Sequence, residues 1–274
     1  MYQNEATMSR ADFRLFFLSF LCMLLCASAA WSQSQGADAG KGATPILIEL
    51  FTSEGCSSCP PADAWLQRLD AAQPIPGAQA IVLSEHVDYW NHDGWTDPFS
   101  SSLLTERQNE YARILGLSSP YTPQLIVDGK SELALTDGSQ VSKVLLEAAK
   151  SAQVPVRIED IHVDSPGTLR AHIVADGSAE KHNADVFAVL ALDHAESQVL
   201  HGENGGHHLT HVAVAQEIAK IGKLEKGMTL VVDYQAKLKR GMDPKNLRLV
   251  VFVQESGPGE VLGAAMQEVS QSGK

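Results

Sequence analysis

The sequence predicts an α/β domain followed by a mostly antiparallel, β-sandwich-like domain. From Pro45 to Ala152, apolar runs typical of buried strands alternate with segments whose apolar residues recur at helical spacing. After Gln153 the chain changes to short runs that alternate with period two, separated by turn signals and with little helix. This change predicts a boundary near residue 153, with domains over residues 45–152 and 153–270.

The elements expected in the first half follow one another with clear end signals. Pro74 and Pro76 end the first helix, Gly116 stops the second, and Asp128-Gly129 is a hairpin turn. In chain order we expect a strand at 46–51, a helix at 62–72, a strand at 80–83, a helix at 99–115, a hairpin of strands 123–127 and 132–135, and an amphipathic helix at 139–152.

The second half reads as a series of strands. Val154-Val156-Ile158 and Leu169-Ala171-Ile173 alternate with period two, and the turn Ser256–Gly259 separates the last two runs. The other expected strands are at 186–192, 230–234, 247–254 and 261–267.

The first 44 residues predict an exported protein. Arg10 and Arg14 precede the uncharged segment 15–30, which ends in small residues and is shorter than a membrane span. We therefore expect a cleaved signal peptide at 1–30, a flexible lead-in at 31–44, and no stable membrane anchor after cleavage. The predicted location is the periplasm or the outside of the cell, where disulfides persist.

The composition narrows the possible partners. The formal net charge is −12, and no extended basic patch is present, which argues against nucleic-acid binding. No motif indicates hydrolysis, phosphate binding or a flavin, so no cofactor is predicted.

The cysteines carry the strongest functional signal. Cys22 and Cys26 lie in the leader, which leaves Cys56 and Cys59 as a C-x-x-C pair between a strand and a helix. A disulfide that closes so short a ring contributes little to stability, so the pair is better interpreted as reactive. A helix start favours the thiolate, which makes Cys56 the expected nucleophile and Cys59 the resolving thiol. We expect the Cys56 sulfur to be open to protein or peptide thiols.

Two other interpretations of the pair remain open. A C-x-x-C pair is also half of a zinc site, although no second pair completes one. The first alternative is therefore a periplasmic Cu(I) or Zn(II) protein that uses the cysteines with a histidine-rich segment. The second is a redox-inert binding module with a structural disulfide. The histidines in question are His194, His201, His207, His208 and His211.

Other residues are candidates for the same site. Tyr121 and Thr122 precede Pro123 at the start of a strand, and the backbone at Thr122 is a candidate to bind an extended substrate, whether the proline is cis or trans. His86 and Trp90 follow the second strand and are candidates to line the cleft.

Two carboxylates flank the cysteine pair. Glu54 and Asp63 are candidate proton relays for the thiols, with helix capping as the alternative role.

Four motifs together resemble those of an exported bacterial family, domain of unknown function 1223, in the thioredoxin-like superfamily. They are Phe51–Asp63, His86–Trp90, Tyr121–Gln124 and Gly202–Gly205. The resemblance implies a thioredoxin-like fold for residues 45–152, but the family has no established activity. Gly55 stands where thioredoxin itself has a tryptophan before the cysteine pair.

Overall fold

The structure is a computed structural model that describes residues 42–135 and 138–269. The predicted signal peptide and most of the predicted lead-in lie outside the described residues. Within the described ranges, no helix is both long and apolar enough to cross a membrane.

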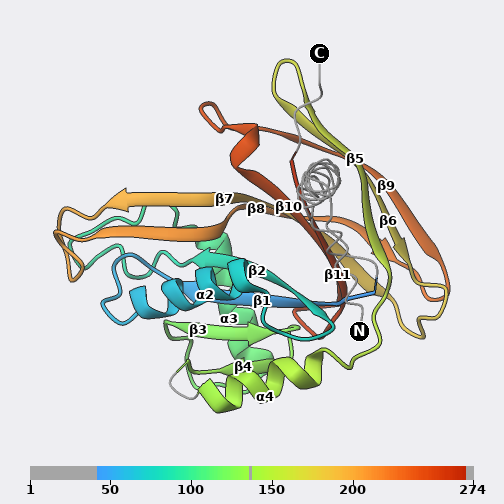
Figure 1. The fold of residues 1–274 in the computed structure, drawn as a ribbon, viewed down its shortest axis with the longest axis horizontal. Helices are drawn as coiled ribbons and strands as arrows, with labels where there is room; N and C mark the ends of the chain where they lie inside the picture. Colours follow the sequence, from blue (N-terminus) through green and yellow to red (C-terminus); the bar gives the residue numbers. More distant parts are fainter. Residues whose placement is uncertain (1–41, 136–137, 270–274) are drawn as a thin grey trace, which may run out of the picture. The chain divides into compact units, whose positions relative to one another are not determined.

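Strands dominate the described part of the chain, as Figure 1 shows. The helices are α2 (Pro60–Ala72), α3 (Ser102–Ile114), α4 (Gly138–Ala148) and the 3-10 turn η1 (Pro244–Asn246). The strands are β1 (Thr44–Thr52), β2 (Ala78–His86), β3 (Gln124–Val127), β4 (Ser131–Leu133), β5 (Val156–Asp164), β6 (Thr168–Asp176), β7 (Ala184–Gln198), β8 (His208–Leu224), β9 (Thr229–Lys237), β10 (Leu247–Glu255) and β11 (Val261–Glu268).

The larger sheet has eight strands in the order β11-β10-β7-β8-β2-β1-β3-β4. Strand β1 runs parallel to β2 and antiparallel to β3, and β3 returns as β4 after the Asp128-Gly129 turn. Both turn residues have positive φ, as the predicted hairpin requires. Strand β2 also runs parallel to β8, which it pairs at Ser84 and Val214.

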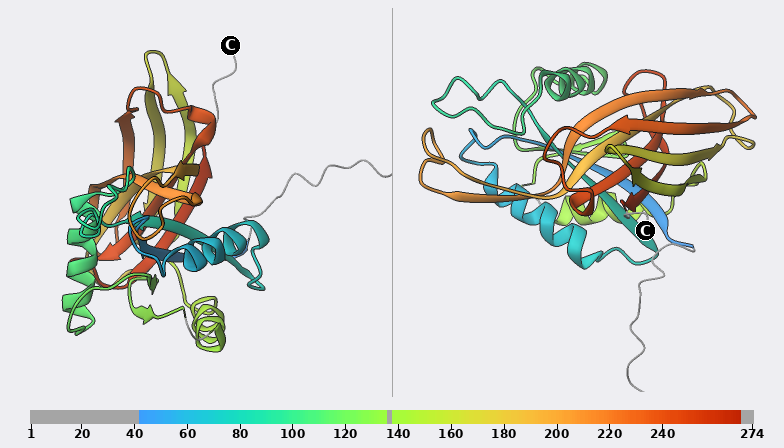
Figure 2. Two further views of the ribbon diagram at one scale, coloured as in Figure 1. Left: turned by 90° about the vertical axis from the view of Figure 1, so that its left-hand side faces the viewer. Right: turned by 90° about the horizontal axis from the view of Figure 1, so that it is seen from above.

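The smaller sheet has three antiparallel strands in the order β5-β6-β9. Its inward residues, such as Leu169 and Ile173, pack with Val186 and Val251 of β7 and β10 in one apolar core. Figure 2 shows this sheet beside those strands. A second core joins β1, β2 and β3 to α2 and α4, with Ile48 and Leu66 among its members.

The predicted fold class, an α/β thioredoxin-like domain followed by a β-sandwich-like domain, is wrong. The protein is mostly β, and the strands of both halves form one mixed eight-stranded sheet, so a separate small α/β thioredoxin fold is not evident. The physical reason is strand β8, which pairs β7 on one side and β2 on the other. The period-two pattern breaks off within β8, so no local pattern indicates the strand that connects the halves.

Strands β7 and β8 form a long hairpin whose pairing continues from Ala184–Leu224 to Gln198–His208. The two strands run side by side to a loop at residues 199–207 (Figure 1). This hairpin brings the second half of the sequence to the cysteine pair.

Candidate functional site

Cys56 and Cys59 form a disulfide at the start of α2. The chain turns tightly there, because the Cys59 N–H donates to the Cys56 carbonyl at 3.1 Å and the Ala62 N–H donates to the Cys59 carbonyl at 2.8 Å. Helix α2 begins with Pro60, which lacks an N–H and therefore leaves no unpaired donor at the first helical position. Cys59 is the capping residue and supplies no side-chain hydrogen bond to the helix.

Both sulfurs are covered in the disulfide form. Cys56 is 1% exposed and Cys59 is 0% exposed, so the expectation of an open Cys56 sulfur is not met in this state. The Ser58 hydroxyl lies 3.3 Å from the Cys56 sulfur, and the Thr122 carbonyl oxygen lies 3.9 Å from it. A partner sulfur must therefore approach beside these two groups.

A groove of 480 Å³ runs along α2 next to the disulfide. Tyr121, Thr122 and Pro123 line it, and the peptide bond between Thr122 and Pro123 is cis. The groove thus contains three of the predicted site residues. Its other lining residues are Ser58, Pro61, Ala62, Trp65, Arg68, Ala134 and Leu135.

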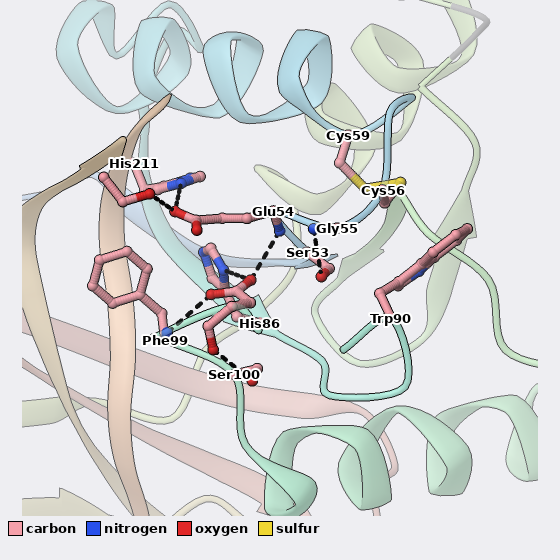
Figure 3. A network of polar contacts seen from close by, with 12 residues as sticks. Ser53, Glu54, Gly55, Cys56, Cys59, His86, Trp90, Phe99, Ser100 and His211 are labelled. Atoms are coloured by element: carbon pink, nitrogen blue, oxygen red, sulfur yellow. Dashed lines mark hydrogen bonds and ion pairs between the residues drawn. A yellow bond between two sulfur atoms is a disulfide. The ribbon is translucent and has the colours of Figure 1, made fainter. Parts of the chain in front are cut away.

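Trp90 supports the groove rather than lining it. Its indole N–H donates to the Thr122 hydroxyl at 2.8 Å, which fixes the residue before the cis proline. Gly55 allows the same tryptophan to approach the cysteine loop, because a Cβ there would lie 2.9 Å from the Trp90 Cβ. Figure 3 shows Trp90 beside the disulfide.

The loop of the β7–β8 hairpin holds the cysteine loop in place. The Asn204 side chain, which is buried, donates to the carbonyl oxygens of Glu54 at 2.8 Å and Cys56 at 3.0 Å. The Glu203 carboxylate accepts from the Ser57 N–H at 3.1 Å. The Gly202–Gly205 motif therefore has a structural role at the site.

Behind the disulfide lies a group of buried ionisable side chains that we call the disulfide network. Glu54 is its hub, since its carboxylate accepts from the Ser197 hydroxyl, from the Trp95 indole N–H at 2.8 Å and from the His211 Nε2–H at 3.2 Å. Figure 3 shows the contact between Glu54 and His211. The members of the disulfide network are Glu54, Asp63, His86, Asp97 and His211, each at most 5% exposed.

His86 belongs to the disulfide network and does not line the groove. Its Nδ1 lies 2.7 Å from Asp97 Oδ2, and the Glu54 N–H donates to the same oxygen at 2.8 Å. Burial alone would lower the pKa of His86, but the Asp97 carboxylate, with Asp63 and Glu54 behind it, raises it on balance. Burial conversely favours a higher pKa for Asp97, but His86 and two backbone N–H groups lower it.

Asp63 faces His211 on the other side of the hub. Its Oδ2 lies 3.8 Å from His211 Nδ1, and neither that nitrogen nor Asp63 Oδ1 has a hydrogen-bond partner. Burial raises the pKa of Asp63, although His211 and His86 oppose the shift. The alternative capping role finds no support, because α2 has no side-chain cap.

Sequence reasoning missed Asp97 and Ser197, which have no motif of their own, since only the fold carries them to Glu54. Asn204 was within a motif quoted from the sequence, so that motif was the signal that could have identified it.

The histidine-rich segment does not gather around the cysteines. His211 is buried, whereas His194, His201, His207 and His208 are exposed. Among the described residues, no three His, Cys, Asp or Glu side chains are arranged to hold a metal ion.

Comparisons with known proteins identify a family and shared folds. The model of a family described as a protein of unknown function, DUF1223, matches residues 47–254. The crystal structure of protein AGR_C_4864 from Agrobacterium tumefaciens is similar with a TM-score of 0.67 and 26% identity, over 85% of this chain and 97% of that chain. HBP35 of Porphyromonas gingivalis is similar in fold, with a TM-score of 0.62 and 14% identity over 84% and 76% of the two chains. No curated protein matches the sequence.

Proposed function

The chain belongs to the DUF1223 family of proteins of unknown function, and we propose that it exchanges disulfides with protein or peptide thiols through Cys56 and Cys59. The leader expected from the sequence supports work in the periplasm or outside the cell, where a cysteine pair can stay oxidised. The observation that carries the proposal is a disulfide of sequence separation 3 at a helix start, beside a groove.

A purely structural role explains this disulfide poorly. A ring of so few residues removes little entropy from the unfolded chain, so the bond adds little stability. The hydroxyl of Ser58, 3.3 Å from the Cys56 sulfur, is a donor ready to stabilise a thiolate. The helix start acts in the same direction.

The exchange proceeds in two balanced steps. A partner thiolate attacks the Cys56 sulfur, the bond between the two cysteines breaks, and Cys59 leaves as a thiolate that takes up a proton. A second partner thiolate then attacks the mixed disulfide, and Cys56 leaves with the bonding electrons. In the opposite direction the Cys56 thiolate attacks a partner disulfide, and Cys59 resolves the product.

The groove gives the partner a place to bind. Thr122, which lines the groove, has its carbonyl oxygen 3.9 Å from the Cys56 sulfur, and Trp65 and Leu135 are among the apolar residues of the lining. An extended peptide segment with a cysteine suits such a groove, because backbone pairing tolerates many side chains. In this proposal Glu54 and Asp63 donate and accept protons behind the two sulfurs. His86 acts through Asp97 and does not contact the substrate.

Trapping with Cys59→Ser tests the proposal. Without the resolving thiol, Cys56 should remain linked to its partners, so non-reducing gels of the native compartment should show mixed disulfides that a reductant releases. Cys56→Ser is the matched control and should trap nothing. If Cys59→Ser also traps nothing and the wild-type disulfide resists glutathione, the disulfide is inert and the proposal is wrong.

A further inference from the structure

Three polar atoms of the disulfide network have no hydrogen-bond partner, and two of them, Asp63 Oδ1 and His211 Nδ1, belong to the Asp63–His211 pair; the third is His86 Nε2. His211 Nε2 is committed to Glu54, whose carboxylate already accepts from Ser197 and Trp95. His211 Nδ1 and Asp63 Oδ1 have no hydrogen-bond partner although both residues are buried. Buried polar atoms without partners are costly, and they concentrate where a group must exchange a proton.

Asp63 is also the network member nearest to Cys59 along the chain. The Asp63 N–H donates to the Cys59 carbonyl at 3.1 Å, across the first turn of α2. Residues four apart on a helix lie on one face, so the Asp63 carboxyl and the Cys59 sulfur share the inward side of that turn. Both are buried, at 5% and 0% exposure, which keeps bulk water from serving the sulfur directly.

We propose that the Asp63–His211 pair is the proton donor and acceptor for Cys59, with His211 supplied by strand β8 from the distant half of the sequence. When Cys59 leaves as a thiolate, the pair gives it one proton. When Cys59 attacks the mixed disulfide at Cys56, its proton returns to the pair, and the partner leaves as a thiolate. The inference rests on the proposed disulfide exchange, and the partner thiol or disulfide supplies the electrons.

The pair holds one proton between an acid and a base. In this proposal His211 donates from Nε2 to Glu54, and its Nδ1, 3.8 Å from Asp63 Oδ2, exchanges a proton with the Asp63 carboxyl. The other ionisable groups that face the pair are Glu54 from the loop after β1, His86 from the end of β2 and Asp97 from the loop before α3. His211 acts through Asp63 and is therefore a positioning residue in this proposal.

The reaction of the reduced protein with dithiobis(2-nitrobenzoate), followed by stopped flow, separates attack by Cys56 from attack by Cys59. The first release of thionitrobenzoate reports attack by Cys56 and depends on reagent concentration. The second release reports attack by Cys59 and does not. At pH 7 we expect Asp63→Asn to slow the second release by about tenfold to a hundredfold, in line with general acid–base catalysis. His211→Gln keeps a donor toward Glu54 but lacks the base, and it should slow that release by about tenfold.

Raising the pH should rescue both variants, because hydroxide then removes the Cys59 proton. The first release should be unchanged, and His208→Gln, an exposed histidine on the same strand, is the matched control. A second release with wild-type rate and pH dependence in both variants would overturn this inference while disulfide exchange stands. A wild-type protein that gives no second release would overturn both.

A measurement on the wild type covers the case in which the variants do not fold. Redox-difference infrared spectra should show a protonated carboxyl band that responds to reduction of the disulfide. The absence of any such band would overturn the proposal.

Discussion

Two groups of buried ionisable side chains in this protein differ in how their charges are matched. The first is the disulfide network, in which three carboxylates face two histidines. The second lies under α3 and is called the Arg107 cluster: Glu49, Glu85, Arg107, Tyr111 and Gln254. Both groups are buried beside the same sheet, but only one has a cation that keeps its proton at all physiological pH values.

The Arg107 guanidinium lies at the centre of a set of hydrogen bonds in the Arg107 cluster. Arg107 donates to Glu49 at 2.7 Å and to the Tyr111 hydroxyl at 2.8 Å, and Tyr111 donates to the other oxygen of Glu49 at 2.7 Å. Glu85 is the surplus carboxyl, 3.7 Å from Arg107. Burial and then the neighbouring Glu49 raise the pKa of Glu85 well above its ordinary value.

The disulfide network instead relies on imidazoles, which gain and lose protons near neutral pH. Both groups contain buried polar atoms without a hydrogen-bond partner, among them both carboxyl oxygens of Glu85. Only the disulfide network adjoins the cysteine loop, through the backbone of Glu54 and Asp63. The comparison therefore teaches that neither burial nor unpaired atoms mark a proton-handling site, and we expect such a site also to need imidazoles that titrate and a connection to the reacting sulfur.

The largest effect is expected from Arg107→Met. Removal of the cation leaves Glu49 buried beside Glu85 without a counter-charge, which should lower the free energy of unfolding by about 3–5 kcal/mol. Urea denaturation at pH 7 measures the loss. Arg113→Met on the exposed side of α3 is the control and should change stability by less than about 0.5 kcal/mol. If the two variants lost the same free energy of unfolding, Arg107 would not be the counter-charge of the buried carboxylates, and the prediction would be wrong.

A smaller and pH-dependent effect is expected from His86→Gln in the disulfide network. The pKa of His86 is raised in the folded protein. The contribution of His86 to the free energy of unfolding is therefore fully present below the unfolded pKa of about 6.5, and it is lost as the pH rises through the folded pKa. The pKa of Asp97 is lowered in the folded protein. Its contribution to the free energy of unfolding is therefore present above the ordinary pKa of about 3.8, and it is lost as the pH falls through the folded pKa. We therefore expect the variant to lose about 1–3 kcal/mol near pH 6.

That loss should shrink as the pH rises toward 9. Urea unfolding of the oxidised protein at pH 6 and pH 9 checks this, with the disulfide kept intact so that the cysteines do not titrate. His208→Gln, with 53% of its side chain exposed, should show no such trend. A pH-independent loss would show that His86 contributes packing and not charge.

Much of the local structure was predictable, because local signals suffice for it. The start of α2 at the cysteine pair, the Asp128-Gly129 hairpin and the inward face of α4 follow from turn chemistry and periodicity. The sheet was not predictable, since it depends on β8, where the alternation of buried and more exposed residues over His208–Ala213 gives way to residues of mixed burial. Pairing between distant strands leaves no local signal in either strand.

The same difference between local and long-range signals applies to the candidate site. The sequence located Cys56, Cys59 and Thr122, because a motif or a proline stands at each. His86 was placed in the cleft but is buried against Asp97, at the end of a strand whose last seven residues are all buried. Asp97 and the role of His211 emerge only when three separate segments meet at Glu54.

The smallest effect is expected from a variant of the hairpin loop, which connects the disulfide network with the cysteine pair. Asn204→Ala removes two hydrogen bonds that hold the carbonyl oxygens of Glu54 and Cys56 under the hairpin. Solvent can then replace part of the lost bonding, so we expect a loss of about 1 kcal/mol in the free energy of unfolding. The freed loop should uncover the Cys56 sulfur more often, so dithiothreitol should reduce the disulfide several times faster. Gln198→Ala, which removes one exposed hydrogen bond within the same hairpin, should leave the reduction rate unchanged. If both variants are reduced at the wild-type rate, the hairpin does not control access to the disulfide.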